Sequence, residues 1–349
     1  MNPPTLDTTV VTDKTVLLRA DLDIDTFDHK IPNSKRLQIT LNTLSLLDQK
    51  KPRKIIILSH RGRPTKQDRS LSLEPIAKYL VSNFSPDLEF VDYQPLANFV
   101  SLRNQILSSS HKYFLLENLR FWQEETNPTQ GFAQELGSLG EVYVNESFAT
   151  SHRDVTSIVA LPKEMKNQNL PTVIGPHFAE ELNNLDKIVS QSKKPLVTIL
   201  SGLKKDKLDY LDGLINISDQ VLVSGRLPEF MDEDYEHPRV TVAKLNPDKE
   251  DITIHSIEKF EEAVSLAKTI IVSGPMGHFE DPGHTLGTER VLIAAANNQQ
   301  AFKLAGGGDT EEALKKFHFT DKFDWISVGG GAMLEYLTKH TLPGIEALK

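Results

Sequence analysis

The chain has 349 residues, of which 39% are hydrophobic and 25% charged, and these proportions exclude a largely disordered protein. The formal net charge of −9 argues against bulk attraction to nucleic acids or anionic membranes, so any anion site must be a local basic cluster. The absence of cysteine excludes disulfides, thiolate zinc sites and a catalytic cysteine.

The first half of the chain alternates strand-length apolar runs with helical periodicity. Four runs have the length of buried strands: residues 15–19, 54–58, 113–116 and 142–144. Leucines recur at spacings of three and four residues from Leu37 to Leu47, which predicts a helix between the first two runs. Ile76, Ala77 and Leu80 predict the next helix in the same way.

The second half repeats this alternation. Five more runs predict strands: residues 195–200, 221–223, 269–272, 302–305 and 325–328. Helices are predicted between them, for example over residues 310–317. A polar stretch at 163–169, followed by a predicted helix at about 178–190, separates the halves. This pattern predicts an α/β fold with mainly parallel sheets that carry helices on both faces.

Three predicted strands of the second half end in glycine-rich turns. These turns are Gly306-Gly307-Gly308-Asp309-Thr310, Gly329-Gly330-Gly331-Ala332 and Ser273-Gly274-Pro275-Met276-Gly277. Adjacent glycines let backbone N–H groups converge on an anion, and the start of a following helix adds partial positive charge. One glycine triplet is as readily a tight turn. Three glycine-rich turns at successive strand ends favour phosphate binding, because such loops line the ligand crevice of parallel sheets.

Asp309 opens the helix after the first of these turns. It suits either the cap of that helix or a ligand of Mg²⁺ held through water, and the two roles are compatible. Two nucleotide signatures are missing, since no Gly-Lys dipeptide supports a Walker A loop and neither triplet continues as G-x-G-x-x-G. A bound nucleotide would therefore use a different kind of loop.

Basic residues follow the predicted strands of the first half. His60, Arg61 and Arg63 follow the second strand, Arg120 follows the third, and His152-Arg153 follows the fourth. Arg36 opens the first helix. Guanidinium groups bind phosphate and carboxylate in bidentate fashion. Their shared position favours a site for a small, multiply charged anion over a scatter of surface arginines.

These segments together resemble phosphoglycerate kinases, in the family's order and over nearly the whole chain. The resemblance rests on Arg19-Ala20-Asp21-Leu22-Asp23, Ser59-His60-Arg61-Gly62-Arg63-Pro64, Leu115-Leu116-Glu117-Asn118-Leu119-Arg120-Phe121, Val142-Tyr143-Val144-Asn145-Glu146-Ser147-Phe148-Ala149-Thr150-Ser151-His152-Arg153, Gly274-Pro275-Met276-Gly277-His278-Phe279-Glu280, the two glycine triplets, and Leu342-Pro343-Gly344-Ile345-Glu346-Ala347-Leu348.

The resemblance implies two Rossmann-like domains with mainly parallel sheets, joined by a hinge helix at about 178–190. The first domain would span residues 1–170, the second would span residues 171–337, and the tail 338–349 would pack back on the first. It also implies reversible transfer of a phosphoryl group from 1,3-bisphosphoglycerate to MgADP, giving 3-phosphoglycerate and MgATP. Closure of the domains would bring the substrates in line and exclude water.

The resemblance assigns roles to particular residues. The first domain would bind the glycerate through Asp21, Asp23, Arg36, His60, Arg63, Arg120 and Arg153. The second would bind the nucleotide through Lys204, Lys207, Glu280, Gly306, Gly307, Gly308, Asp309 and Thr310, with Glu280 on the ribose and Asp309 on Mg²⁺. A further phosphate loop would be formed by Gly329, Gly330 and Gly331. Transfer to a carboxylate needs no general base, so Arg36 and Lys204 are the candidates for stabilising charge on the transferring group.

The chain departs from the family's pattern in several places. Asp23 stands where the family has Asn, and Val155 stands where it has a second His. The family's Gly-Gly-Ala-Lys, two residues, then Asp-Lys, is here the shorter segment Ser201-Gly202-Leu203-Lys204-Lys205-Asp206-Lys207, so that Lys204 or Lys207 must shift or the next helix must start early. The chain after Val223 is also trimmed, which predicts a more open adenosine pocket and weaker discrimination between bases.

Three other interpretations compete with an active kinase. The first is a catalytically weak or inactive family member that binds 3-phosphoglycerate or a nucleotide in a regulatory role, and the reach of Lys204 would distinguish it. The second is a phosphatase or dehydrogenase, for which no nucleophile or hydride-cofactor signature is found. The third is a zinc site at His278, Glu280, Asp281 and His284, which the loop context and the lack of helical metal spacing disfavour.

The N-terminal segment Met1-Asn2-Pro3-Pro4 lacks the basic and apolar regions of a secretory signal. Apolar runs such as Ile55-Ile56-Ile57-Leu58 are too short to span a bilayer. We therefore expect a cytoplasmic protein whose partners are its small-molecule substrates, with no nucleic acid or membrane among them. The resemblance adds the expectation of a monomer.

Overall fold

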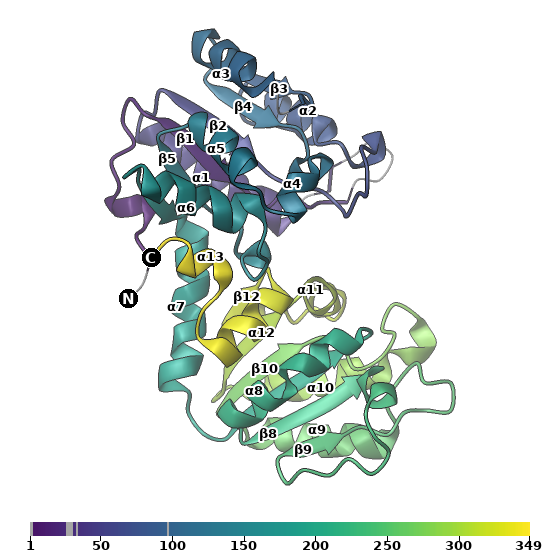
Figure 1. Ribbon diagram of the computed structural model, residues 1–349. Helices are drawn as coiled ribbons and strands as arrows, with labels where there is room; N and C mark the ends of the chain where they lie inside the picture. The colour runs from purple at the N-terminus through teal and green to yellow at the C-terminus, as the bar shows by residue number, and fades with distance from the viewer. Residues whose placement is uncertain (1–2, 26–30, 33, 96–97) are drawn as a thin grey trace. The chain divides into compact units, whose positions relative to one another are not determined.

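The computed structural model describes residues 3–25, 31–32, 34–95 and 98–349, and the chain forms two compact units (Figure 1). The first unit is Met1–Glu181 together with Leu342–Lys349, and the second is Leu182–Thr341. The division falls inside helix α7 (Pro176–Gln191). The sequence placed this boundary earlier, at residues 170–171, and began the returning tail at residue 338 rather than 342.

The first unit is built on a parallel sheet of six strands among the described residues. In spatial order these strands are β3 (Leu88–Val91), β4 (Tyr113–Leu116), β2 (Lys54–Leu58), β1 (Thr15–Arg19), β5 (Val142–Asn145) and β6 (Thr172–Ile174). Arg19 at the end of β1 pairs with Leu58 on one side and Asn145 on the other. The carboxyl ends of these three strands therefore meet at one edge of the sheet.

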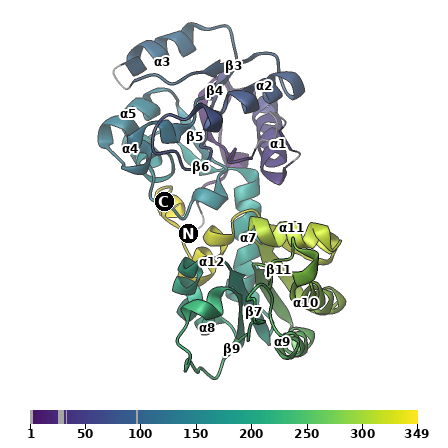
Figure 2. The ribbon, with the colours of Figure 1, turned by 90° about the vertical axis from the view of Figure 1, so that its right-hand side faces the viewer.

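Helices cover both faces of this sheet, as Figure 2 shows, with α1 and α2 on one side and α4 and α5 on the other. The helices are α1 (Lys35–Gln49), α2 (Glu74–Asn83), α3 (Phe99–Ser108), α4 (Gln123–Thr126), α5 (Gln130–Ser138), α6 (Leu161–Asn167) and α13 (Pro343–Glu346). Successive strand residues point to opposite faces. Accordingly Val16 and Leu18 pack in one core with residues of α1 and α2, whereas Leu17 is buried against the other face.

Short helical turns follow several strands of this unit and carry residues discussed below. They are 3-10 turns at Leu6–Thr8, Arg69–Leu71, Leu119–Phe121 and Phe148–Thr150, and a π-helical turn at Thr156–Ala160. The C-terminal segment joins this unit through a hydrogen bond from the Gly344 amide to the carbonyl of Ser151, at 2.9 Å. Ala347 is buried there with Val155, Ile158 and Val159.

The second unit repeats the plan with its own six parallel strands among the described residues. Their order is β12 (Trp325–Ser327), β11 (Phe302–Gly306), β10 (Thr269–Ser273), β7 (Leu196–Gly202), β8 (Gln220–Gly225) and β9 (Val240–Val242). The strands with the most central positions, β10 and β7, are buried along their whole length. All three glycine-rich turns follow neighbouring strands and lie at the carboxyl edge of this sheet.

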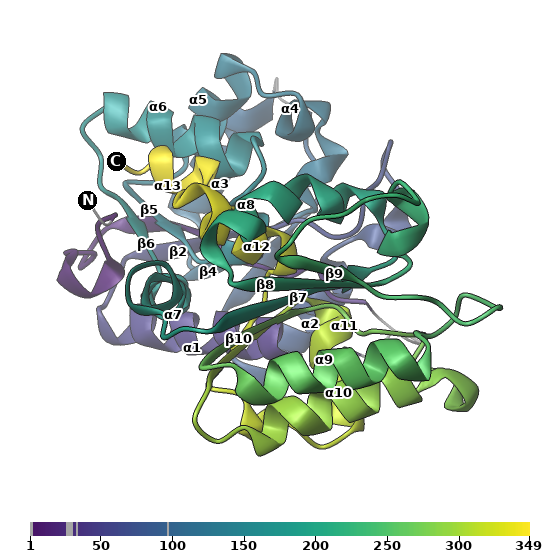
Figure 3. The ribbon, with the colours of Figure 1, turned by 90° about the horizontal axis from the view of Figure 1, so that it is seen from below.

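Figure 3 shows α9 and α10 on one face of this sheet and α8 and α12 on the other. The helices are α8 (Leu211–Ile217), α9 (Ile254–Leu266), α10 (Leu286–Asn297), α11 (Gly308–Lys316) and α12 (Gly330–Lys339), with 3-10 turns at Lys205–Tyr210, Leu227–Phe230, Pro282–His284 and Thr320–Lys322. The core under α9 to α11 includes Phe260, Val291 and Leu314. No helix in the described ranges has both the length and the apolar character needed to cross a bilayer.

The predicted α/β class with parallel sheets is confirmed, and all nine predicted strands occur. The sequence missed the short strands β3, β6 and β9. It was wrong about the polar stretch at 163–169, which is largely helix α6 and packs on α5 and β5 within the first unit. Leu161 and Met165 are buried on that helix, and these two apolar positions are too few to reveal it among its polar neighbours.

Candidate active site

Seven predicted ligands of the first unit lie around the carboxyl edge of its sheet. Asp21 and Asp23 follow β1, His60 and Arg63 follow β2, Arg120 follows β4, and Arg153 follows β5, while Arg36 begins α1. The strand register brings these loops together, although the residues are distant in the chain. We call Arg36, His60, Arg63, Arg120 and Arg153 the cationic cluster.

Arg36 is anchored over the loop that follows β1. Its Nε lies 3.3 Å from Oδ2 of Asp21, and its Nη1 donates a hydrogen bond of 2.8 Å to the carbonyl of Asp23. The helix below it is capped by Ser34, whose hydroxyl accepts from the Leu37 amide at 3.2 Å. About a third of the Arg36 side chain remains exposed, at 31%, so the guanidinium can still meet a ligand.

His60 is buried and held as a neutral hydrogen-bond donor. Its Nδ1 lies 2.8 Å from Nη2 of Arg19. A guanidinium can only donate, so Nδ1 must accept and the ring proton must sit on Nε2. That nitrogen lies 3.6 Å from Oδ2 of Asp23. Burial lowers the pKa of His60 well below its usual value, and the nearby arginines lower it further.

The arginines of the cluster repel one another. Burial lowers the pKa of Arg120 to about 10; Arg153 lowers it further, while Asp23 raises it. Burial also lowers the pKa of Arg153, followed by the charge of Arg63, and Asp23 again acts in the opposite direction. Arg120 donates to the carbonyl of Gly62, whereas Arg63 is exposed. A bound anion would offset this repulsion, which is the electrostatic signature of an anion site.

Arg19 supports this site from beneath. No role was predicted for this residue from the sequence, where it was named only as part of the motif Arg19-Ala20-Asp21-Leu22-Asp23. Its side chain is fully buried, and its Nε donates to the hydroxyl of Ser157 at 2.8 Å. The same hydroxyl donates to Oε1 of Glu125 at 2.6 Å, and the Ser157 amide donates to Oε2 at 2.9 Å. One feature of the sequence could have pointed to this buried role: Arg19 is a charged residue at the end of an otherwise apolar strand.

The glycine loops of the second unit pack directly on each other. Gly307 has a φ of +103° and precedes the first turn of α11, and a Cβ added to Gly330 would lie 2.9 Å from the Cα of Gly307. By contrast, a Cβ on Gly308 would meet nothing within 4 Å. The starts of α11 and α12 are therefore close together, and the outer side of the first loop is open.

Thr310 serves this loop as a structural brace. Its hydroxyl accepts from the Gly274 amide at 2.8 Å and donates to the carbonyl of Gly306 at 2.9 Å. The side chain is buried, so it ties the first glycine turn to the turn after β10. Asp309 beside it is exposed, as expected for a residue that meets a ligand.

The two predicted lysines occupy different environments. Lys207 donates to the carbonyl of Ser201 at 2.5 Å and to that of Ser273 at 3.2 Å. Burial lowers its pKa to about 8, against an opposing effect from Asp309. Lys204 is exposed, and no hydrogen bond or ion pair links its side chain to any described residue. The shortened loop therefore places Lys207 beneath the glycine turns and leaves Lys204 accessible.

A cavity of about 260 Å³ opens beside these loops. It is lined by Gly202, Leu203, Gly225, Arg226, Lys249, Glu250, Pro275, Gly277, His278, Glu280 and Asp309. Glu280 lies at its rim, with Oε2 at 3.8 Å from Nε2 of His278. The size and the mixed lining suit part of a nucleotide, with Asp309 at the end near the glycine loops.

The acidic and histidine residues near this cavity form ion pairs. His278 Nδ1 lies 3.3 Å from Glu250, while His284 lies 3.1 Å from both Asp248 and Asp281. Within the described ranges no three such groups converge as metal ligands. Mg²⁺ commonly binds through one or two carboxylates together with substrate phosphates. Asp309 fits that mode, whereas a zinc site has no support in the geometry.

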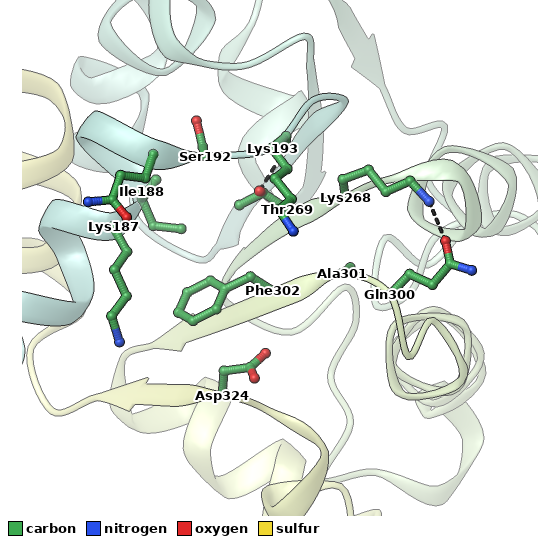
Figure 4. A pocket seen from close by; sticks show the side chains of 11 residues that line it. Lys187, Ile188, Ser192, Lys193, Lys268, Thr269, Gln300, Ala301, Phe302 and Asp324 are labelled. Carbon is green, nitrogen blue, oxygen red and sulfur yellow. Dashed lines mark hydrogen bonds between the residues drawn. The ribbon is translucent and has the colours of Figure 1, made fainter.

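A second cavity, of about 350 Å³, lies at the opposite, amino edge of this sheet (Figure 4). Lys187, Lys193 and Lys268 line it together with Phe302 and Asp324. The Nζ of Lys268 donates to Gln300 at 2.5 Å, one of the two contacts drawn. Lysines near the C-terminal end of α7 suit the negative pole of that helix. None of the predicted site residues is found here.

Comparison with family models and with curated proteins identifies similarity to phosphoglycerate kinases. The family model described as phosphoglycerate kinase matches residues 6–234 and 229–340. A phosphoglycerate kinase of Bdellovibrio bacteriovorus is 31% identical, with 96% of this chain and 94% of the relative covered. One from Orientia tsutsugamushi strain Boryong is also 31% identical, with 98% and 97% covered.

Two solved structures share the fold. Phosphoglycerate kinase from Coxiella burnetii superposes with a TM-score of 0.79, and that from Pyrococcus horikoshii OT3 with 0.80. Each is 24% identical in sequence, and each alignment covers 99% of this chain and 98% of the other. These likenesses agree with the two parallel sheets described above.

Proposed function

The chain belongs to the phosphoglycerate kinase family, and from this premise we propose that it transfers a phosphoryl group reversibly from 1,3-bisphosphoglycerate to MgADP. The products would be 3-phosphoglycerate and MgATP. The reaction class is that of a phosphotransferase with a carboxyl group as acceptor in the reverse direction. The observation that carries the proposal is that one chain contains both features: a cationic cluster in the first unit, and glycine loops that begin helices in the second.

The cationic cluster suits the glycerate substrate. Its arginines present bidentate donors for a phosphate and a carboxylate, and His60 presents one further N–H donor from Nε2. Arg36 is the residue we assign to the transferring group, because it is partly exposed and anchored at the start of a helix. Asp21, Arg63, Arg120 and Arg153 would complete the glycerate site, and Asp23 would line it.

The second unit would hold the nucleotide. The starts of α11 and α12 would receive its phosphates, Glu280 its ribose, and Lys204 and Lys207 the charge near the transferred group. The Mg²⁺ that accompanies the nucleotide would be held by Asp309 and would offset negative charge on the phosphates. Since the acceptor carboxylate is already ionised, the protein supplies positioning and charge stabilisation rather than a base.

The shortened lysine loop favours Lys204 over Lys207 as the group that acts on the transferring phosphoryl. Lys207 is occupied by two backbone carbonyls, whereas the Lys204 side chain is exposed. The same shortening is the reason for a second candidate function, that of a regulatory family member that binds 3-phosphoglycerate without turnover. In that case Lys204 would fail to reach the phosphoryl group.

A coupled assay with 3-phosphoglycerate, ATP and Mg²⁺ tests the proposal on the wild type and on Lys204→Ala. We expect the substitution to lower kcat by roughly a hundredfold or more, as for removal of one charge-stabilising group. Lys205→Ala is the matched control, because Lys205 is the exposed neighbour of Lys204 and has no assigned role. Absence of wild-type turnover together with intact 3-phosphoglycerate binding would favour the regulatory function.

We further infer a cytoplasmic, monomeric enzyme whose partners are its small-molecule substrates. The net charge of −9 supports the part of this inference that concerns partners, because it disfavours nucleic acids and anionic membranes. Gel filtration with light scattering would test the monomer.

A further inference from the structure

A carboxylate stands inside the cationic cluster. Oδ1 of Asp23 accepts from the Gly62 amide at 2.7 Å, and Oδ2 lies 3.6 Å from Nε2 of His60. The same charge raises the pKa of both Arg120 and Arg153. The side chain is 37% exposed, so this carboxylate faces the space in which an anionic ligand would be held.

We propose that Asp23 is a specificity-determining residue that acts as an internal competitor for the acidic substrate. Its negative charge would partly neutralise the arginines that a ligand anion would otherwise neutralise, and so keep the affinity for 3-phosphoglycerate low. This inference rests on the proposed function, since it assumes that the cationic cluster receives that substrate.

The geometry allows competition because the protein directs donors at this carboxylate. The proton of His60 must lie on Nε2, since Arg19 donates to the other ring nitrogen. The nearest acceptor recorded for that N–H is Oδ2 of Asp23, which at 3.6 Å is too far for a direct hydrogen bond. A ligand oxygen that accepts from this N–H gains one donor and lies close to one like charge, that of Asp23.

The charge balance of the cationic cluster explains why the charge of Asp23 should weaken ligand binding more than that of another carboxylate. Asp21 already pairs with Arg36 at 3.3 Å, so that cation is partly compensated before any ligand arrives. Asp23 then offsets part of the charge on Arg120 and Arg153. Removing its charge should therefore strengthen the field that holds a multiply charged ligand, by more than the loss of an ordinary surface carboxylate would.

Asp23→Asn isolates the charge, because the amide has nearly the same shape and its oxygen can still accept from the Gly62 amide. We expect the Kd for 3-phosphoglycerate, measured by calorimetry without nucleotide, to fall about tenfold at low ionic strength. KM should fall in parallel with no rise in kcat. The difference should shrink with added salt, because screening weakens a charge effect.

Asp25→Asn is the matched control, because it removes the same charge from an exposed side chain of the same loop. Its Kd should stay within about twofold of the wild type. An equal fall of the Kd in both variants would show that the effect comes from net charge alone, and would overturn the proposal. An unchanged or weaker Kd in Asp23→Asn would also overturn it, since Asp23 would then serve the ligand as an acceptor.

The outcome is separable from that of the proposed function. If the wild type binds 3-phosphoglycerate without turnover and Asp23→Asn binds it more tightly, the inference stands and the kinase activity fails. If turnover is normal and the Kd does not fall, the reverse holds. A thermal melt checks folding, and Asp23→Ser, which also removes the charge and keeps a polar side chain, repeats the test if the Asn variant is unstable.

Discussion

Nη2 of Arg19 donates to Nδ1 of His60 at 2.8 Å, and this contact sets the tautomer of the histidine in the cationic cluster. Arg19 is itself oriented by Ser157, to which its Nε donates at 2.8 Å. The histidine therefore cannot accept a second proton on Nδ1 without losing its buried partner. Because His60 is neutral, it can donate a hydrogen bond to an anion without adding to the repulsion among the surrounding arginines.

The first prediction is that His60 stays neutral at pH values where an ordinary histidine is protonated. Its pKa is lowered by burial and then by Arg19, so protonation is disfavoured in the folded state. A histidine whose folded pKa lies below its unfolded value stabilises the fold above pH 6.5, and this contribution is lost as the pH falls. Two-bond ¹H–¹⁵N spectra should show the proton on Nε2 from pH 8 down to pH 6. An imidazolium signal at pH 6 would contradict this.

The second prediction concerns the buried pair of Arg19 and Glu125, bridged by Ser157. Burial raises the pKa of Glu125, and the charge of Arg19 opposes that rise. Arg19→Met should lower the free energy of unfolding by about 3–5 kcal/mol, because a carboxylate is left buried without its cation. Adding Glu125→Gln should recover part of the loss, as measured by urea unfolding.

Arg53→Met provides the comparison for this pair, since Arg53 pairs with Glu141 at the surface, with half of its side chain exposed. It should cost less than about 1 kcal/mol. Purely additive losses in the Arg19 and Glu125 double variant would count against electrostatic coupling.

Much of this architecture follows from local sequence. The strand at Thr15–Arg19 was predicted at its observed bounds, because an uninterrupted apolar run ends where the polar loop begins. The edge strand Val240–Val242 was missed, since it is only half-buried and three residues long. Helix α6 was missed for a similar reason, because its polar surface positions dominate its seven residues.

The site divides in the same way. Residues in loops at strand ends, such as His60 and Arg120, were predicted because the order of parallel strands brings strand ends together. The role of Arg19 was not predictable, because Ser157 lies 138 residues away and its hydroxyl contact depends on packing. The difference between Lys204 and Lys207 likewise depends on backbone carbonyls that only the folded loops bring into place.

The third prediction tests the contact between the glycine loops. Gly330→Ala should impair nucleotide binding and lower the melting temperature, because its Cβ would lie 2.9 Å from the Cα of Gly307, which is backbone and cannot rotate away. A loss of about 1–3 kcal/mol is expected for overpacking of this kind. Gly131→Ala is the control, since its Cβ meets nothing within 4 Å and should be neutral or stabilising. Equal melting temperatures for the two variants would contradict the close contact.

The fourth prediction concerns the base of the nucleotide. The cavity beside the glycine loops is lined by charged residues such as Arg226, Lys249 and Glu250, and Leu203 at its mouth is 69% exposed. Such a lining offers little shape selection between purines, so we expect kcat/KM for ATP and GTP to differ by less than about tenfold. That limit corresponds to about 1.4 kcal/mol. A preference for ATP above a hundredfold would refute this.

The last prediction follows from Lys207, whose pKa is lowered to about 8, chiefly by burial. Binding of nucleotide phosphates favours its charged form, so the Kd for MgADP should rise between pH 7 and pH 9 as the amine loses its proton. Stability without nucleotide should change in the opposite sense. Between pH 8 and the unfolded value of 10.5, the unfolded chain holds a proton that the folded chain lacks, so the free energy of unfolding rises with pH.

Lys207→Met should remove the pH dependence of both the Kd and the free energy of unfolding. Lys205→Met is the control, because it replaces an exposed lysine of the same loop. Calorimetry at pH 8 in two buffers of different ionisation enthalpy measures the proton taken up when MgADP binds to the wild type. Uptake close to half a proton is expected, because the amine is about half protonated there before the phosphates arrive. Zero uptake, or a pH dependence that survives in Lys207→Met, would assign the titration to another group and leave Lys207 as a brace for the carbonyls of Ser201 and Ser273.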